Sequence, residues 1–108
     1  MQFGEIYFSY VYPKKIKAWH IHKKMTLNLV VPIGEVHFVI YDERYKSQSK
    51  GNFFSVELSP LDYYRLTVPC GLWIAFMGKG KSNLILNIAS IEHDPNEIER
   101  HDLNKFDY

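Results

Sequence analysis

Two histidines, His20 and His22, stand two residues apart in a run of residues typical of a β-strand. Because side chains two positions apart on an extended strand share a face, both imidazoles point the same way. A pair of this kind suits either a metal site or proton transfer near neutral pH. Surface or packed histidines give the same spacing, so the pair alone leaves these interpretations open.

A basic stretch surrounds the two histidines. Residues 14–24 contain five lysines and no acidic residue. Such a group of lysines can bind a phosphate-bearing ligand, although lysines also protect solvated strand edges from pairing with other chains. The formal net charge of the whole chain is only +1, which predicts no nucleic-acid partner.

The elements that must position these residues are short β-type runs separated by turn residues. The chain has 108 residues, which predicts one domain over residues 1–108. The expected strands lie at 5–12, 15–22, 26–31, 35–41, 53–58, 63–68, 72–77 and 83–89. Pro32-Ile33-Gly34 separates two of these strands, and we expect them to form a hairpin there.

Eight short strands without a long amphipathic helix predict an all-β sandwich or jelly roll. After residue 92 the pattern changes to an irregular or helical C-terminal tail. A helical turn is expected over Pro95–Arg100, because Asp94 suits an N-cap and Pro95 suits a first helical position.

The cysteine count and the lengths of the apolar runs predict a cellular location. A single cysteine, Cys70, excludes an internal disulfide and fits a reducing compartment. We see no charged-then-apolar leader and no apolar run long enough to span a bilayer. The prediction is a cytoplasmic protein without a membrane partner.

The histidine strand, the glycine at position 34 and a later Pro69-Cys70-Gly71 turn together resemble the two sequence boxes of the cupin superfamily. The resemblance implies a cupin-type double-stranded β-helix, which is a jelly roll. In metal-binding cupins the boxes supply a glutamate and a further histidine, but those positions hold Leu27 and Ile74 here. Because a metal needs a filled set of donors, we expect no metal and no cofactor.

A longer set of segments, in the same order, resembles one branch of the cupins. These segments are residues 4–9, 16–29, 41–44, 68–69 and 93–95. They are similar to the dTDP-4-dehydrorhamnose 3,5-epimerase-like proteins, over nearly the whole chain. The resemblance implies a sugar-nucleotide ligand and a reaction in which a base removes a proton next to a ketone.

The resemblance also implies roles for individual residues. His20 matches the histidine base of the family, and Lys17 stands where the family has an arginine that neutralises phosphate. A lysine keeps the charge but lacks the bidentate fork of arginine. Trp73 is expected near the barrel mouth, where it could stack on a sugar or a base. The predicted substrate-binding set is Lys17, His22, Glu5, Tyr7, Asn87 and Trp73.

The chain departs from the family at the position of its acid. The family uses a tyrosine on a late strand, and that position is Asn87 here, while the second histidine of the family is Ile74. Asparagine cannot supply a proton in the same way. Three tyrosines on other strands remain as replacements: Tyr7, Tyr41 and Tyr63.

Three functions remain open from the sequence. The first is epimerisation or isomerisation of a sugar nucleotide in deoxysugar and cell-surface polysaccharide biosynthesis, with His20 as base and Asp94 or Asp102 to orient it. The second is a cupin that binds a sugar or sugar nucleotide without turnover. The third is a metal-dependent cupin enzyme, against which Leu27 and Ile74 argue. Exposed sheet edges and the resemblance predict a homodimer.

Overall fold

The computed structural model describes residues 3–108, and its regular structure is almost entirely β-strand. The strands are β1 Glu5–Val11, β2 Ile16–His22, β3 Leu27–Ile33, β4 Val36–Tyr41, β5 Phe53–Leu58, β6 Leu66–Val68, β7 Trp73–Gly78, β8 Asn83–Ala89 and β9 Ile98–Arg100. Two 3-10 turns, η1 Pro95–Glu97 and η2 Leu103–Lys105, lie in the tail. Within this part of the chain, no helix has the length and apolar character needed to cross a membrane.

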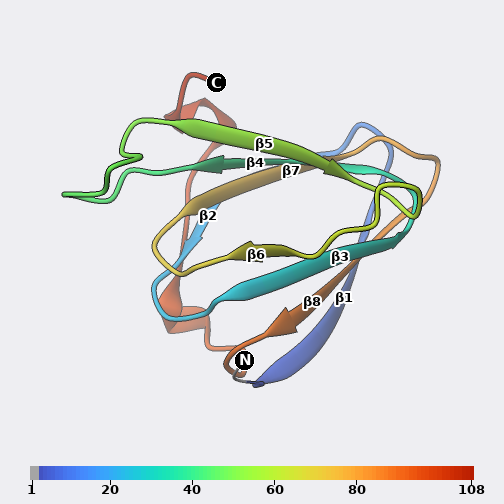
Figure 1. Cartoon of the computed structure of the whole chain (residues 1–108), viewed down its shortest axis with the longest axis horizontal. Helices are drawn as coiled ribbons and strands as arrows, with labels where there is room; N and C mark the ends of the chain where they lie inside the picture. Colours follow the sequence, from blue (N-terminus) through green and yellow to red (C-terminus); the bar gives the residue numbers. More distant parts are fainter. Residues whose placement is uncertain (1–2) are drawn as a thin grey trace.

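The strands form two antiparallel sheets that face each other (Figure 1). One sheet has the order β1-β8-β3-β6, and the other has the order β5-β4-β7-β2-β9. Successive strands along the chain often change sheet, which is typical of a jelly roll rather than a simple meander. The all-β prediction with a partly helical tail is confirmed.

The expected hairpin between β3 and β4 is wrong, because the two strands lie in different sheets. Gly34, with a φ of +82°, carries the chain from one sheet to the other. A Cβ at this position would lie 2.1 Å from the carbonyl oxygen of Ser82, so the crossing needs glycine. The buried Asn83 side chain fixes the corner by accepting the Glu35 backbone N–H and donating to the carbonyl of Val11.

The interior between the sheets is apolar because alternate residues of each strand point inward. Val31, Val36 and Phe38 are fully buried there with side chains from the other strands. A second cluster lies on the outer face of the five-stranded sheet, where the C-terminal tail covers Trp19 and Trp73. The tail therefore completes the fold on the side of β2.

The tail departs from the sequence prediction in one respect. Asp94 caps η1 by accepting the backbone N–H of Asn96, as expected, but the turn ends at Glu97. The chain then extends into β9, which pairs with β2 and places Arg100 opposite His20. In Figure 1 the whole C-terminal tail, coloured red, runs along one side of the sandwich, from near the N-terminus to the opposite side of the molecule. Elsewhere in the chain, the strand expected at 63–68 is shorter than predicted, because β6 contains only Leu66–Val68.

Candidate functional site

A cavity of 760 Å³ lies between the two sheets, on the side of β1, β2 and β8. This volume is within the range of small-molecule sites. Its floor is apolar and includes Leu27, Phe38 and Ile74. Its polar and charged lining residues are Glu5, Tyr7, Ser9, Lys17, His20, His22, Asn87, His93 and Arg100. The cavity thus combines an apolar body with a few polar groups that can orient a ligand.

A β-bulge in β2 selects which side chains reach the cavity. The register with β7 pairs Lys17 with Phe76 and His20 with Ile74, so two residues of β2 stand opposite one residue of β7. Such a bulge reverses the alternation of side chains beyond it. Strict alternation would send Lys17 and His20 to opposite faces, whereas the bulge brings both to the cavity.

His20 lies half-buried in a cationic environment. Its ring packs edge-on against His22, with 5.4 Å between centroids, and against Phe76 at 6.3 Å. Burial, followed by the nearby His22, Arg100 and Lys17, lowers the pKa of His20 to about 4. At neutral pH the imidazole is therefore uncharged and able to accept a proton.

His22 is held by a buried carboxylate. Its Nδ1 lies 2.5 Å from Oε2 of Glu97, whose side chain is 1% exposed. The other oxygen, Oε1, accepts the backbone N–H groups of Lys24 and Met25. Although burial alone raises the pKa of Glu97, the hydrogen bonds from His22 and from these two N–H groups leave the pKa below its usual value. Glu97 is ionised and fixes the ring orientation of His22.

The sequence did not identify Glu97 or Arg100 as site residues. Asp94 and Asp102 are the carboxylates that the sequence offers for orienting the base, but Asp94 caps η1 and neither lines the cavity. Glu97 follows Asp94 by three residues, a spacing that one turn brings under β2. No local pattern marks this residue, because its role depends on the pairing of β9 with β2.

The wall opposite the histidines comes from β1, in the other sheet. Glu5, Tyr7 and Ser9 alternate along this strand and face the cavity. Oε1 of Glu5 accepts the backbone N–H of His93, and the ring of Tyr7 meets that of His93 edge-on at 6.2 Å. The structure therefore brings Glu5 and Tyr7 to the same cavity as His20.

Asn87 also lines the cavity, from β8, but its amide already has partners. Its Oδ1 accepts the backbone N–H of Asn28, and its Nδ2 lies 3.9 Å from Sδ of Met25. Asn87 therefore ties β3 to β8 while facing the site.

Trp73 is the one predicted binding residue that the structure does not bring to the cavity. It pairs with Ile21 across β2 and β7 on the outer face of the sheet, because its neighbour Ile74 takes the inner position. There it packs against Phe106 at 5.5 Å and is buried by the tail. In this position its indole ring has no access to a ligand between the sheets.

The two positions that hold ligands in metal-binding cupins lie in the cavity floor. Leu27 and Ile74 are 4% and 1% exposed, and neither has a donor atom in its side chain. Across residues 3–108, no three histidine, cysteine or acidic side chains gather as a metal site. The residues present in the cavity do not fit the ligand set of a metal-dependent cupin.

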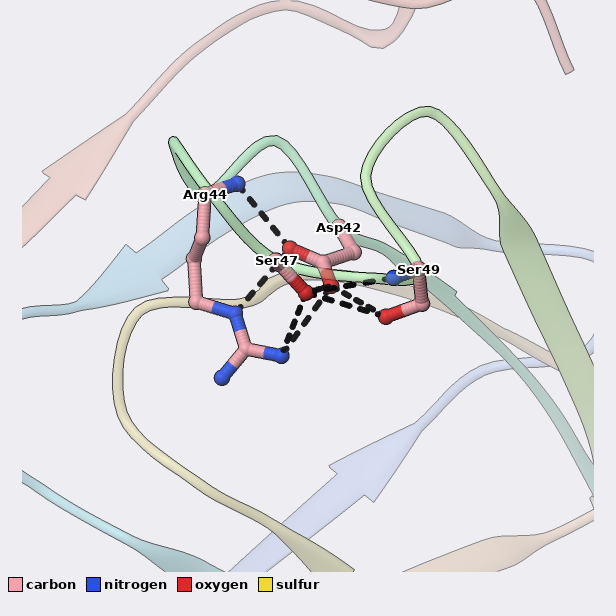
Figure 2. A network of polar contacts seen from close by, with 4 residues as sticks. All are labelled: Asp42, Arg44, Ser47 and Ser49. Atoms are coloured by element: carbon pink, nitrogen blue, oxygen red, sulfur yellow. Dashed lines mark hydrogen bonds and ion pairs between the residues drawn. The ribbon is translucent and has the colours of Figure 1, made fainter.

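A second polar cluster lies outside the cavity, in the loop between β4 and β5 (Figure 2). Asp42 accepts hydrogen bonds from the backbone N–H, Nε and Nη2 of Arg44 and from the hydroxyl groups of Ser47 and Ser49. These bonds, led by those from Arg44, hold the pKa of Asp42 far below its usual range. The cluster closes the loop and presents no free acceptor to a ligand.

No family model matches the chain. Comparison with solved structures, however, identifies proteins of similar fold. The structure superposes with a TM-score of 0.93 on a dTDP sugar isomerase from Desulfovibrio desulfuricans G20, with 40% sequence identity. The aligned region covers 97% of this chain and 68% of that chain. The jelly-roll prediction agrees with this similarity.

Two curated proteins are also similar in sequence. The probable low-salt glycan biosynthesis epimerase Agl13 of Haloferax volcanii is 27% identical over 90 residues, which is 82% of this chain. The spore coat polysaccharide biosynthesis protein SpsL of Bacillus subtilis is 29% identical over 99 residues, or 88% of this chain. The chain spans 58% and 64% of the lengths of these two relatives.

Proposed function

Because the chain belongs to the family of dTDP-sugar epimerases and isomerases, which have the cupin fold, we propose that it epimerises or isomerises a nucleotide-linked keto sugar. The substrate class is a dTDP-4-keto-6-deoxyhexose, and His20 is the base. The names of the curated relatives support a place in the biosynthesis of cell-surface polysaccharide or glycan.

One observation carries the proposal. His20 is an uncharged imidazole in the lining of a ligand-sized cavity, and within residues 3–108 no side chain hydrogen-bonds to its ring. The other cavity imidazole, His22, is already engaged by Glu97. A general base needs a free nitrogen within reach of the proton it removes. His20 meets this requirement.

The reaction proceeds through an enolate. His20 takes a proton from the carbon next to the ketone, and the electrons of the C–H bond move onto the carbonyl oxygen. Positive charge and hydrogen-bond donors placed near that oxygen lower the barrier.

Two cations on the same wall of the cavity as His20, Lys17 and Arg100, suit the diphosphate of the ligand. Charge-assisted hydrogen bonds to phosphate are short and strong, and arginine can form two of them in parallel. Lys17 stands where the family resemblance places an arginine, and Arg100 on the neighbouring strand β9 brings a guanidinium to the site. We therefore assign phosphate binding to Lys17 and Arg100 together.

The test is solvent-proton exchange. The protein is incubated with dTDP-4-keto-6-deoxyglucose in deuterated water, and proton NMR follows the signals at the two carbons beside the ketone. Wild-type protein is expected to exchange at least one of these protons, and His20→Asn is expected to lose the exchange. His37→Asn is the matched control, because His37 lies on β4 beside Glu57 and does not line the cavity.

The outcomes separate the two leading functions. Exchange that survives in His20→Asn would contradict the assignment of the base. No exchange in wild-type protein, combined with a raised melting temperature in the presence of the dTDP-sugar, would favour binding without turnover, because a ligand that binds only the folded state stabilises it.

We also propose that the protein acts as a cytoplasmic homodimer. β1 is an edge strand, and its outward side chains Ile6, Phe8 and Tyr10 are 48%, 66% and 66% exposed. A row of exposed apolar side chains on a sheet edge is typical of an interface. Light scattering after gel filtration is expected to give the mass of two chains, and Ile6→Ser is expected to shift the mass toward that of one.

A further inference from the structure

The catalytic cavity has two walls from two different sheets. His20 and His22 project from β2 in the five-stranded sheet, while Tyr7 projects from β1 in the four-stranded sheet. A ligand between the sheets therefore has imidazoles on one side and a phenol on the other. This arrangement matters for epimerisation, which removes a proton from one face of a carbon and returns one to the opposite face.

The hydroxyl group of Tyr7 has no partner. Its oxygen is buried, and within residues 3–108 it makes no hydrogen bond. Buried hydroxyl groups in folded proteins are normally paired, and an exception calls for an explanation. A ligand in the cavity would supply the missing partner.

Tyr7 stands directly beside the position expected for an acid. The register of β1 and β8 pairs Tyr7 with Asn87, and cross-strand partners share one face of the sheet. Asn87 cannot act as an acid, and its amide is engaged with β3. The phenol of Tyr7 thus occupies the same region of the cavity from the neighbouring strand.

The other tyrosines of the described chain are elsewhere. Tyr41 packs on the outer face of the sheet against Phe53 and Phe106, at 4.5 and 4.4 Å. Tyr63 is exposed in the segment before β6. Within residues 3–108, Tyr7 alone among the tyrosines lines the cavity.

We propose that Tyr7 is the general acid of the reaction and protonates the enolate carbon from the face opposite His20. This inference rests on the proposed function. His20 removes the proton from carbon, and the C–H electrons pass to the ketone oxygen to form the enolate. The enolate then takes the Tyr7 hydroxyl proton on its other face, and the carbonyl re-forms. Tyrosinate regains a proton from water and the His20 imidazolium releases one, so no net proton is consumed.

The electrostatics of the wall agree with this role. Burial, together with the negative charges of Glu5 and Glu97, raises the pKa of Tyr7 above its usual value. The phenol therefore stays protonated at neutral pH, and it can still donate because the enolate carbon is a much stronger base than a phenolate.

The test separates exchange from inversion. Wild-type protein, Tyr7→Phe and His20→Asn are each incubated with dTDP-4-keto-6-deoxyglucose in deuterated water, and NMR follows both deuterium incorporation and the formation of inverted product. Tyr7→Phe is expected to keep exchange within about 3-fold of wild type, because His20 can return a deuteron to the face it came from. Its inverted product is expected to fall by at least about 100-fold. Tyr64→Phe, at an exposed position before β6 that does not line the cavity, is the matched control.

Each other outcome has a definite meaning. Inverted product at the wild-type rate in Tyr7→Phe would overturn the inference. A parallel loss of exchange and product, with a lower melting temperature, would show that Tyr7 is structural and would also overturn it. Wild-type protein that moves the ketone without inverting a carbon would overturn it as well. If the wild-type protein shows no exchange, the proposed function itself fails first.

Discussion

Two polar clusters of this protein differ in whether their polar groups have hydrogen-bond partners within the protein. In the β4–β5 loop, the Asp42 carboxylate is 4% exposed and accepts bonds from Arg44, Ser47 and Ser49 (Figure 2). In the cavity, the buried hydroxyl of Tyr7 has no hydrogen-bond partner, and no side chain of residues 3–108 hydrogen-bonds to the ring of His20. The first cluster is complete without a ligand, and the second is not.

The number of hydrogen bonds that a polar group makes separates a structural role from a ligand-binding one. A carboxylate with a full set of donors is stable in its charged form and has little capacity left for a substrate. A buried hydroxyl group without a partner, such as that of Tyr7, is unfavourable in the folded protein unless it serves another molecule. The hydrogen bonds of Asp42 therefore explain loop closure, and the unpaired ring of His20 agrees with its proposed role in proton transfer.

Glu97 combines features of both clusters, because its carboxylate is fully paired yet holds His22, which lines the cavity. Glu97→Ala would leave His22 and the backbone N–H groups of Lys24 and Met25 without their acceptor. We expect a loss of roughly 3–5 kcal/mol in the free energy of unfolding, together with lower turnover. Urea denaturation measures the first effect, and Glu97→Gln, which keeps one acceptor oxygen, should recover part of it. An unchanged midpoint in Glu97→Ala would show that this buried carboxylate is not structural.

Asp42→Ala is expected to have the next largest effect, and on stability alone. The loop loses the acceptor that joins Arg44 to the two serines, and we expect about 1–3 kcal/mol of destabilisation. Turnover per folded molecule should stay at the wild-type level, because the loop does not line the cavity. Reduced turnover in fully folded Asp42→Ala would remove the distinction between the two clusters.

The pH dependence of kcat/KM tests the electrostatic environment of His20 in the cavity. His20 must be uncharged to accept a proton, and its pKa is lowered to about 4, so kcat/KM should stay level from neutral pH down and fall only near that value. Arg100 is among the causes of the lowered pKa, so Arg100→Gln should move the acid limb to higher pH. An acid limb near 6.5, the ordinary value for histidine, would contradict the described environment of His20.

Ser49→Ala should have the smallest effect. It removes one of several donors to Asp42 at an exposed position, so we expect a change of less than about 1 kcal/mol. Thermal unfolding compared with Ser55→Ala, a substitution on exposed β5, gives the measurement and its control. A change larger than that of Asp42→Ala would mean that the carboxylate does not organise the loop.

The sequence predicted the architecture well because strand alternation and turn residues are local signals. Seven of the eight expected strands begin and end within two residues of the expected positions, and β6 is shorter than expected. The hairpin at Gly34 failed because a turn of the same composition can join strands of one sheet or of two. Only the packing of the second sheet on the first decides between them.

The site was predicted in part for the same reason. His20 and His22 share a strand, so their common face followed from spacing, whereas the bulge that turns Lys17 inward follows from pairing with β7. Glu97 meets His22 across 75 positions in sequence, and Trp73 turned outward because Ile74 took the inner face. These contacts depend on tertiary pairing and carry no local pattern.

One measurement tests the central claim most directly: the rate at which solvent deuterium enters dTDP-4-keto-6-deoxyglucose, compared between His20→Asn and Asp42→Ala at a temperature where both are folded. We expect His20→Asn to keep its melting temperature and lose exchange, while Asp42→Ala melts at a lower temperature and exchanges at the wild-type rate. Exchange at the wild-type rate in His20→Asn, or an equal loss in both variants, would contradict the assignment of chemistry to the cavity.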